Sequence, residues 1–565
     1  MIDKRIRDTY AKDSKATLNT KLYDAYVKFF RWASDRLGER DGVVCFVSNN
    51  SFVHKDSFDG MRKHLFQTFT TIYHLDLGGD AREHGGGNVF EIRVPVGITI
   101  LVRNRGAILE QNVPLGLQYA TVENNLKSKE KLAVLASIKC LDDVEWCSLQ
   151  PNLQQSWLTD GMHEEYSSFI ALYSKEARAT RTVELETIFR TFSLGVSTNR
   201  DGWVYGFDSE ALVSRVRIFL EAYNAEVFRW KDAGYPKDID AFIRYDRIKW
   251  SRDLKNELAR EKYGQFDNAN MRRAYRRPFC KQYIYYDTNL LIDSPAHFLE
   301  VFPNPVAQEE NSVIVVSAHG FRAPFSALVT DAIPDLHLCA TTDGFQCLPF
   351  YTYNEEGSGR RENITEWALE KFRERYGAAV TKRDIFHYVY ALLHHPEYRT
   401  RYTENLKRDL PRVPLVPDAA TFAAFVAAGA RLADLHLTYE TAAEFPLART
   451  ITTEGATLKT LAHVEKMKLS KDKTAVIVNP HLTLAGVPPE AFQYRLGNRS
   501  ALDWVLDQYR VSTDARSGIT SDPNRPDDPE YIVHLIGQVV TVSVETVRVV
   551  AALPALSATL GEGAT

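Results

Sequence analysis

The first hundred residues alternate helical and strand patterns, and this alternation limits the fold more than any other feature of the chain. Residues 18–37 carry apolar side chains at helical spacing and end at Gly38, and residues 42–48 form a short apolar run typical of a buried parallel strand. A second helix is predicted over 57–69 and a second strand over 71–77. Alternating helices and parallel strands build a doubly wound sheet, so the predicted fold class is α/β.

The segment after the second strand is predicted to close this sheet with a β-hairpin, formed by residues 89–91 and 96–102. Together these elements make up only half of a doubly wound, Rossmann-like sheet. The half that would hold a cofactor normally opens with a strand and a glycine-rich turn, and neither pattern precedes Leu18. We therefore expect the second half of such a sheet only. Ligands bind at the carboxyl ends of strands, so 48–52 and 76–79 are expected to border a pocket.

The most basic stretch of the chain lies much further on. It contains five cations within ten positions and a tyrosine shortly after them, and no acid lies among them. Arginine forks fit phosphate oxygens and tyrosine rings stack on bases, so the stretch is a candidate nucleic-acid contact. The end of a solvated basic helix followed by a buried aromatic strand fits the same pattern. The residues concerned are Arg272, Arg273, Arg276, Arg277, Lys281 and Tyr283.

Charge and cysteine usage narrow the class of protein. The chain has 69 basic and 73 acidic residues and a net charge of -4, so DNA binding would require a local basic surface. The six cysteines form no Cys-x-x-Cys pair, which favours a reduced, cytoplasmic chain without a zinc site.

His394 and His395 have no partner at metal-ligand spacing and are expected to face a helix dipole instead. The apolar segment 531–554 contains His534 and Glu545, which favours a buried or amphipathic helix over a membrane span.

A set of ordered motifs resembles adenine-specific DNA methyltransferases, above all the single-polypeptide type ISP and type IIG-like restriction–modification enzymes. The run Ser193-Leu-Gly-Val-Ser-Thr-Asn-Arg-Asp-Gly-Trp203 is similar to a segment that follows the catalytic core in these enzymes, and 277–287 is similar to the opening of their target-recognition domain. Nearly the whole chain takes part in the resemblance. The other matching segments are 21–37, 42–52 and 62–65 in the rear half of the catalytic domain, and 384–399, 410–414, 494–504 and 521–524 in the specificity region.

The resemblance implies S-adenosylmethionine as the cofactor and an Asn-Pro-Pro-Tyr loop as the catalytic element. The sequence contains no Asn-Pro-Pro-Tyr, so no catalytic residue is assigned and this chain alone is expected to be inactive. Phe90 matches an aromatic residue that stacks on the extruded adenine, which contributes roughly 1–3 kcal/mol per base; a core position in the hairpin is the alternative. Tyr26 and Asn49 match the cofactor pocket, or else serve as a core residue and a helix cap.

Within this family, the basic cluster would bind phosphates and position the protein without selecting a sequence. Base contacts are expected from Arg322 in segment 317–322, and from Arg360 and Arg361 in the exposed loop 354–362, because arginine and its neighbours can reach base edges. No nuclease pattern is present, so DNA cleavage is not predicted.

The predicted organisation has four segments: the rear half of a methyltransferase domain (1–105), a largely helical connector (106–275), and two parts of a target-recognition region (276–430 and 431–565). Within the last three segments, apolar periodicity predicts a strand over 313–317 and helices over 212–231, 245–263, 364–376, 382–394 and 419–433. The expected partner is double-stranded DNA, read by part of an adenine-N6 methyltransferase. The alternative is a non-catalytic specificity subunit that works with a separate chain carrying the cofactor half. A remnant with an unstable first segment is a third hypothesis.

Overall fold

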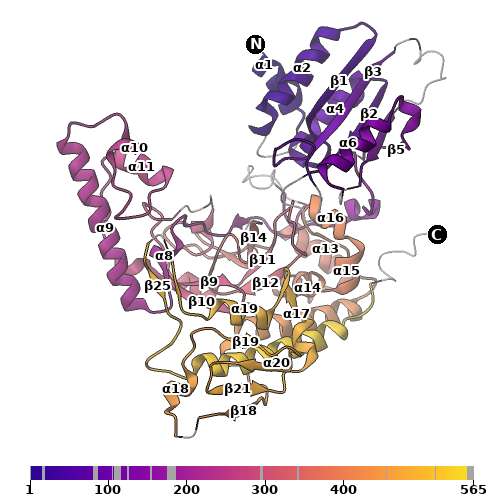
Figure 1. Ribbon diagram of the computed structural model, residues 1–565. Coiled ribbons are helices and arrows are strands. Elements are labelled where there is room, and N and C mark those ends of the chain that lie inside the picture. The colour runs from indigo at the N-terminus through magenta and orange to yellow at the C-terminus, as the bar shows by residue number, and fades with distance from the viewer. Residues whose placement is uncertain are drawn as a thin grey trace. The chain divides into compact units, whose positions relative to one another are not determined.

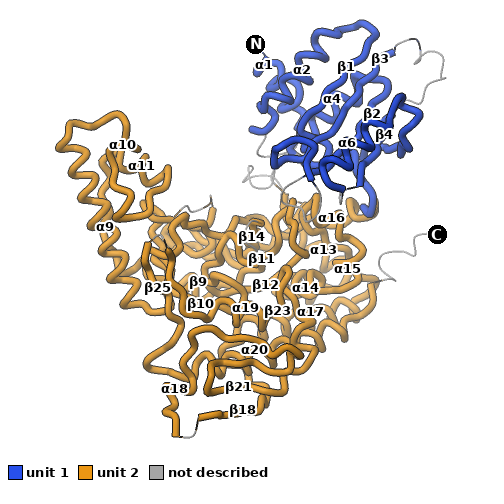
Figure 2. The backbone as a smooth tube through the Cα atoms, viewed as in Figure 1, with its two compact units in different colours: residues 1–162 blue, residues 163–565 orange. Residues whose placement is uncertain are grey.

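The computed structural model describes residues 2–14, 20–79, 87–104, 106, 116–123, 126–152, 155–174, 186–292, 295, 297–339, 343–453, 455–515 and 517–556. The chain forms two compact units, Met1–Met162 and His163–Thr565, drawn in blue and orange in Figure 2. Each unit has its own apolar core. The predicted boundaries at 105, 275 and 430 do not coincide with this division at 162, and they stay predictions.

A five-stranded mixed sheet organises the first unit (Figure 1). Its strands lie in the order β1-β3-β2-β4-β5, where β3 is antiparallel to both β1 and β2, and β4 is parallel to β2. The strands predicted over 42–48 and 71–77 are confirmed as β1 and β2. The bounds are β1 Gly42–Asn49, β2 Thr71–Asp76, β3 Val96–Arg103, β4 Gly116–Thr121 and β5 Cys147–Leu149.

The strand predicted over 96–102 is confirmed as β3, but it lies between β1 and β2, so the predicted parallel pairing of β1 is wrong. The predicted hairpin is also wrong, because its first strand does not form. Residues 89–91 form a bend instead of a strand. Asn88 holds that bend, because its side-chain amide donates to the carbonyl oxygens of Gly79 (2.9 Å) and Val94 (2.7 Å). β3 itself has side chains covered on both faces, which suits a central strand.

The helices that precede β2 pack on one face of this sheet, and α6 packs on the opposite face, where Leu135 lies in a cluster with Leu75 and Val96. The helices predicted over 18–37 and 57–69 are confirmed, although the first begins later, at Ala25. It ends before Gly38, whose φ of +58° is positive, as glycine readily allows. The core side chains of these two helices include Phe30 and Leu65. The helix bounds are α1 Ile2–Ile6, α2 Ala25–Leu37, α3 Ser51–His54, α4 Asp59–Thr68 and α6 Ser128–Ser137.

β1 is an edge strand and is covered on one face only. Val44 and Phe46 pack against the helical side, whereas Val43 (62% exposed), Cys45 and Val47 (54% exposed) alternate with them and point outward. A strand with this alternation is half-buried, so the sequence-based expectation of a fully buried strand was wrong for β1.

The second unit contains three four-stranded sheets, ordered β13-β9-β10-β8, β12-β11-β14-β7 and β18-β21-β20-β19. The strand predicted over 313–317 is confirmed as β11, which is completely buried. Their bounds are β7 Ser193–Leu194, β8 Tyr205–Gly206, β9 Met271–Arg277, β10 Cys280–Tyr285, β11 Val313–Ser317, β12 Ala327–Thr330, β13 Ile333–Pro334, β14 Phe345–Pro349, β18 Ala448–Ile451, β19 Lys468–Leu469, β20 Ala475–Ile477 and β21 Leu482–Ala485.

Among its described residues, the second unit also contains short two-stranded pairs. They are β15 with β16, β17 with β6, β22 with β23, and β24 with β25. Their bounds are β6 Ile170–Ala171, β15 Tyr351–Thr352, β16 Arg361–Glu362, β17 Arg412–Val413, β22 Arg495–Leu496, β23 Arg499–Ser500, β24 Ser512–Thr513 and β25 Thr520–Ser521.

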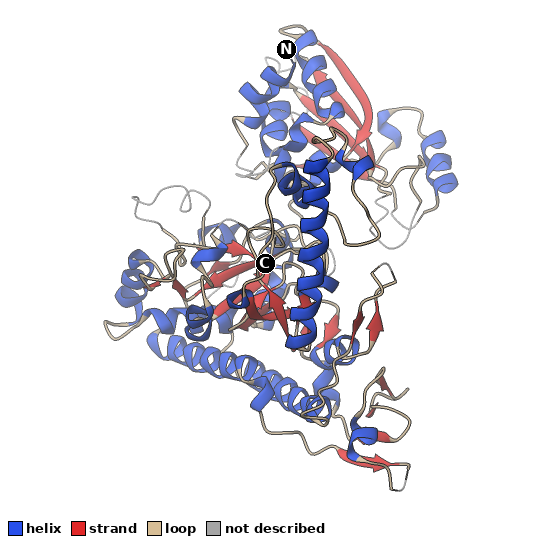
Figure 3. Ribbon diagram, turned by 90° about the vertical axis from the view of Figure 1, so that its left-hand side faces the viewer, coloured by secondary structure: helices blue, strands red, loops and turns tan. Residues whose placement is uncertain are grey.

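The longest helix of this unit, α9, extends away from the sheets with α10 and α11 near its far end (Figure 1). Figure 3 views the molecule from the side on which α9 lies in Figure 1. The helix predicted over 212–231 is confirmed as α9, but the one predicted over 245–263 is wrong, because only Arg252–Ala259 is helical. Ile248 and Trp250 precede it in an irregular segment and are buried. Tertiary burial decides the conformation there, and Ser251 caps the shorter helix.

The remaining helices confirm the predictions made over 364–376, 382–394 and 419–433. α14 crosses α17 closely: a Cβ atom added to Gly429 would lie 1.9 Å from the carbonyl oxygen of His387. α20 is long and apolar enough to span a membrane, but 61% of its most apolar window is buried in the protein, as in a core helix. The bounds are α8 Asp201–Val204, α9 Ser209–Asp232, α10 Ile239–Phe242, α11 Arg252–Ala259, α12 Pro305–Glu310, α13 Glu366–Tyr376, α14 Lys382–Leu392, α15 Pro396–Arg401, α16 Thr403–Arg408, α17 Ala419–Leu437, α18 Leu458–Ala462, α19 Ala501–Gln508 and α20 Tyr531–Ala551.

Candidate nucleic-acid interface

The basic stretch forms a β-hairpin, and this decides where each cation points. β9 and β10 pair antiparallel, with Arg273 opposite Tyr283 and Arg277 opposite Cys280. The turn between them contains Phe279, which is fully buried and has a left-handed φ of +57°. Because side chains alternate across a strand, neighbouring cations of β9 point to opposite faces.

Arg272 points into the protein. Its guanidinium donates to Gln308 Oε1 (2.9 Å) and to the carbonyl oxygen of Asn304 (2.8 Å), and the residue is 5% exposed. Burial lowers the pKa of Arg272 to about 10. The structure thus gives Arg272 a role in joining β9 to α12.

Arg277 forms a buried ion pair with Asp335. Arg277 Nη1 lies 2.9 Å from Asp335 Oδ1, and the two side chains are 15% and 6% exposed. Burial raises the pKa of Asp335, although the charge of Arg277 opposes that shift. A carboxylate in such surroundings needs its cation, so the pair links the hairpin to the segment after β13.

Arg276 and Lys281 are also paired within the unit. Arg276 Nη2 lies 3.5 Å from Asp201 Oδ2, and its guanidinium sits 5.3 Å from the ring centre of Tyr205. Lys281 Nζ lies 3.0 Å from Asp331 Oδ1, with 11% of the side chain exposed. Four of the five cations in the stretch are therefore held by protein groups.

Arg273 differs from its neighbours because it lines an open cavity. Its guanidinium carbon lies 4.8 Å from the ring centre of Tyr283, its cross-strand partner, and among the described residues it has no carboxylate partner. The cavity has a volume of about 490 Å³ and is bordered at one end by the start of α9. Its lining residues are Ser209, Glu210, Val213, Ser214, Asn268, Met271, Arg272, Arg273 and Tyr283.

The other predicted base-contacting arginines are on the surface and each has a protein partner. Arg322 Nη2 lies 2.9 Å from Asp343 Oδ1, and Arg360 Nη1 lies 2.9 Å from Glu310 Oε2. Arg361 lies in β16 and donates to the side-chain oxygen of Asn354 (3.0 Å). These partners orient the side chains, and their role in base contacts stays a prediction.

In the first unit, Phe90 is 52% exposed, at a bend between β2 and β3. This exposure rules out the alternative that Phe90 is a core residue. The backbone N–H of Phe90 donates to Asn88 Oδ1 (2.9 Å), so the same side chain that closes the bend also holds its aromatic residue. The base-stacking role of Phe90 stays a prediction.

Tyr26 and Asn49 each contact other residues of the first unit. The ring of Tyr26 packs 6.4 Å from that of Phe52 and 6.1 Å from that of Phe58, and burial raises its pKa well above the usual value. Asn49 Oδ1 accepts a hydrogen bond from the backbone N–H of Ser51 (2.8 Å) at the start of α3, as expected of a cap.

A polar cluster joins the carboxyl ends of β1 and β2, at the predicted pocket border. Asp76 accepts hydrogen bonds from Asn50 Nδ2 (2.5 Å), Tyr119 OH (3.0 Å) and the N–H of Gly78 (2.7 Å), and it also contacts His54 Nε2 (3.0 Å). Burial alone would raise the pKa of Asp76. The hydrogen bonds with His54 and Gly78 together outweigh this effect, so the pKa is lowered.

The described residues contain no group of three or more His, Cys, Asp or Glu side chains suited to a metal ion. His394 Nδ1 contacts the carbonyl oxygen of Tyr390 (2.8 Å), and His395 Nε2 contacts that of Pro554 (3.0 Å). Burial lowers the pKa of both histidines, so they are neutral side chains in the core.

The sequence model of the type ISP C-terminal specificity domain matches residues 187–535. The chain belongs to this family. The match contains the β9–β10 hairpin and the cavity beside Arg273, and it confirms the resemblance found in the sequence.

Three solved structures resemble 98% of the chain. One is a nuclease-deletion mutant of the type ISP restriction–modification enzyme LlaGI in complex with a DNA substrate mimic (32% identity, TM-score 0.79). The others are a DrdV–DNA complex (35%, 0.79) and the ATP-dependent type ISP enzyme LlaBIII bound to DNA (29%, 0.80). The chain spans 50%, 54% and 35% of their respective lengths. The search of curated proteins gives no match.

In the type ISP specificity domain, the sequence located the basic stretch but not its conformation: the expected helix end is wrong, because residues 271–277 form strand β9. The sequence also could not separate Arg273 from its neighbours. It also missed Asn88 in the first unit. What singles out Arg273 is its position opposite Tyr283. That pairing depends on the register of β9 against β10, which the sequence alone does not give. Asn88 stands two residues before Phe90, and asparagine at a bend is a known turn signal.

Proposed function

We propose that this chain is the DNA target-recognition and base-pocket portion of an adenine-N6 DNA methyltransferase of a restriction–modification system. The observation that carries the proposal is Arg273, an unpaired cation stacked on Tyr283 at an open cavity inside the specificity domain. A fixed fork of donors above an aromatic ring suits a phosphate or a base edge. DNA in the solved relatives supports the same partner here.

Phe90 would contribute to the base pocket. It is an exposed aromatic ring on a bend held by Asn88, close in sequence to the carboxyl end of β2. A base taken out of the stack needs an aromatic or apolar surface to replace its neighbours, and a held ring provides it at low entropic cost.

The two candidate cofactor-pocket residues already have partners inside the first unit. The ring of Tyr26 packs against Phe52 and Phe58, and the side-chain carbonyl of Asn49 caps α3. We therefore propose that the cofactor binds outside these residues, and that the isolated 565-residue chain transfers no methyl group.

A second candidate is a non-catalytic specificity subunit that pairs with a separate cofactor-binding chain. The uncovered face of β1 favours it: Val43, Cys45 and Val47 line an edge strand, and Phe29 (59% exposed) and Trp32 (52% exposed) lie on the outer side of α2. Exposed edges and apolar patches mark sites where another strand or subunit packs. Either version would act in the cytoplasm.

The first experiment measures binding of a fluorescent random-sequence duplex by anisotropy over a range of KCl concentrations. Arg273→Ala should weaken binding and make the slope of log K against log salt shallower by about 0.9, the value for one lost phosphate contact. Arg431→Ala is the matched control, because Arg431 is half-exposed and paired with Asp434 on α17. Equal slopes for Arg273→Ala and the wild type would refute the role of Arg273.

A methyl-transfer assay tests the cofactor proposal, and co-purification distinguishes the two candidates. Labelled S-adenosylmethionine with the chain alone should leave the duplex unlabelled under both. Labelling by the chain alone would contradict the cofactor proposal. Recovery of a cofactor-binding polypeptide with the chain from its native cells would favour the specificity-subunit version.

A further inference from the structure

The lysine-rich segment 459–473 forms an exposed basic surface that the recognition hairpin does not explain. Five lysines lie within fifteen residues, and all five are exposed. Among the described residues none of them forms an ion pair with a carboxylate, in contrast to Lys281 or Lys231. We call these residues the lysine surface: Lys459, Lys466, Lys468, Lys471 and Lys473.

The two acids of the segment offset only part of this charge, because five lysines stand against two carboxylates. Asp472 accepts hydrogen bonds from Ser470 Oγ (2.6 Å) and from Thr474 Oγ1 (2.9 Å), and these bonds lower the pKa of Asp472. Its carboxylate thus fixes the turn between β19 and β20. Glu465 is exposed, and its backbone carbonyl accepts a hydrogen bond from Val511.

The turn presents its lysines from a rigid support. Lys473 takes a left-handed φ of +60°, and its Nζ lies 5.8 Å from the ring centre of Phe492. Behind the turn, Val476 of β20 and Leu484 of β21 are packed in the main core of the unit. Lysine on an edge strand also prevents unwanted strand pairing, but that explains only Lys468 in β19.

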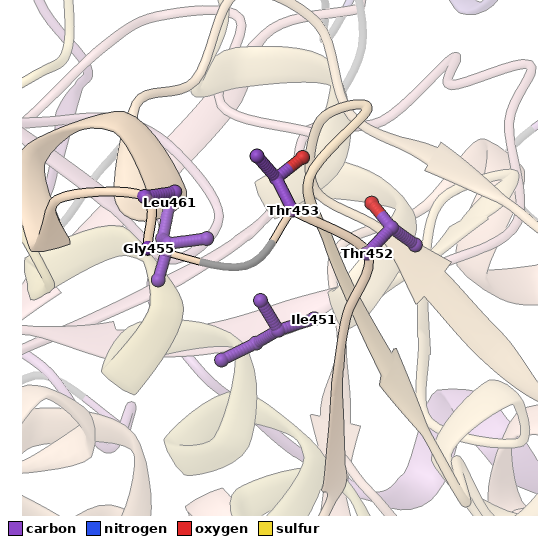
Figure 4. A pocket seen from close by; sticks show the side chains of 6 residues that line it. Ile451, Thr452, Thr453, Gly455 and Leu461 are labelled. Carbon is purple, nitrogen blue, oxygen red and sulfur yellow. The ribbon is translucent and has the colours of Figure 1, made fainter.

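An open cavity of about 560 Å³ lies beside α18, which contains Lys459 (Figure 4). Ile451 and Leu461 line it, together with Thr452 and Thr453. The two threonine hydroxyls are fixed by the carbonyl oxygen of Pro480 (2.8 Å) and by His481 Nδ1 (2.7 Å). The described part of the surface near Lys459 is therefore recessed and polar.

We propose that the lysine surface binds the phosphate backbone of duplex DNA outside the recognition site. The inference takes its ligand, DNA, from the proposed function. It adds a sequence-independent contact to the one proposed at Arg273. Lysine is a compact charge on a flexible stem, which suits phosphates at varying positions better than base edges. The whole chain is acidic, so a local excess of unpaired lysines is what attracts a polyanion.

The test compares two variants that lose the same charge. One carries Lys466→Gln, Lys468→Gln, Lys471→Gln and Lys473→Gln. The control carries Lys63→Gln, Lys231→Gln, Lys371→Gln and Lys407→Gln, at lysines that are at least partly exposed and are paired with acids. Affinity is measured for random-sequence duplexes of about 40 and about 12 base pairs across a KCl series. Circular dichroism confirms that both variants fold.

We expect the lysine-surface variant to bind the long duplex more weakly, and its slope of log K against log salt to be shallower by up to about three to four. Its affinity for the short duplex should change little. Replacing the same four lysines by arginine should restore the slope. An unchanged slope for the long duplex, or equal losses on both duplexes, would overturn the inference. Loss of retention on an acidic polypeptide without loss of DNA affinity would assign the surface to a protein partner and also overturn it.

These outcomes separate the inference from the proposed function. If Arg273→Ala weakens binding and the lysine variant does not, the recognition proposal stands and the lysine surface is ordinary solvated surface. If only the lysine variant weakens binding, the second contact stands and the role of the Arg273 cavity is wrong. A wild-type chain that binds neither duplex would refute both.

Discussion

Replacing Arg277 by alanine should damage folding far more than DNA binding. The guanidinium of Arg277 is the cation next to the carboxylate of Asp335, which is 6% exposed. The substitution leaves that carboxylate buried without a charge partner, and its remaining donors are the backbone N–H of His337 (2.8 Å) and, at 3.4 Å, the hydroxyl of Tyr205. Removing one member of a buried pair is strongly destabilising for this reason.

The size of the effect follows from these surroundings. Breaking a buried ion pair by removing one partner costs about 3–5 kcal/mol. For a cooperative unit of roughly 400 residues, the entropy of unfolding converts this to a fall of about 3–6 °C in the melting temperature. Arg276→Ala should have a smaller effect, because its pair with Asp201 is longer (3.5 Å) and both side chains are more exposed.

The pH dependence gives a second readout with a definite sign. Burial raises the pKa of Asp335 in the folded state, and loss of Arg277 removes the charge that opposes this shift. A carboxyl group with a raised folded-state pKa binds protons more readily when folded, so its contribution to stability falls as pH rises. The deficit of Arg277→Ala should therefore be largest near pH 7 and shrink as the pH is lowered toward 5.

The assay is thermal and urea unfolding followed by circular dichroism at both pH values, with anisotropy at a temperature where all variants are folded. The double variant Arg277→Ala, Asp335→Ala should recover much of the loss, because no buried charge then remains unpaired. A melting temperature equal to that of the wild type, combined with weaker DNA binding and a shallower salt slope, would refute this reasoning and return Arg277 to the DNA interface.

Three further predictions concern single positions. Asn88→Ala should free the bend that carries Phe90, seen as faster proteolysis within 87–95 at unchanged melting temperature; equal cleavage rates would contradict it. Gly429→Ala should destabilise the second unit by about 2 kcal/mol or more, because the new methyl group would meet the carbonyl oxygen of His387 at 1.9 Å; a neutral result in urea unfolding would mean that α14 and α17 separate easily. Asp76→Asn should reduce the loss of stability that the protein shows below pH 3.8, the ordinary pKa of an aspartate. The folded-state pKa of Asp76 is lowered, so its carboxylate stabilises the fold above pH 3.8, and this stabilisation is lost as the pH falls; an unchanged acid titration would count against the network.

Elements set by local periodicity were predictable from the sequence. α9, α14 and β11 needed only the spacing of their apolar residues. The position of β3 was not predictable, because insertion between β1 and β2 depends on pairing with strands far apart in the chain. The helix expected over 245–263 was shortened for a similar reason: Trp250 donates its indole N–H to the carbonyl oxygen of Arg244 (2.9 Å), which fixes an irregular segment.

The candidate site was predictable in composition but not in its accessible members. Five cations in ten residues predicted a phosphate-binding surface, and nothing local to the stretch distinguishes Arg272 from Arg273. Their difference arises from Gln308 and Asn304, more than thirty residues away, which accept hydrogen bonds from Arg272. Burial of a charged side chain depends on such distant partners, so the sequence alone could not assign it.

The distribution of paired and unpaired cations also limits how this chain can attract DNA. A cation already facing a carboxylate releases few counterions when a phosphate approaches, because its charge is partly neutralised before binding. Arg276, Arg277 and Lys281 belong to that class. Arg273 and the lysine surface do not, and they lie on different sheets of the same unit. The salt dependence of binding should therefore arise from separate, individually weak contacts, and removing either one should leave the other measurable.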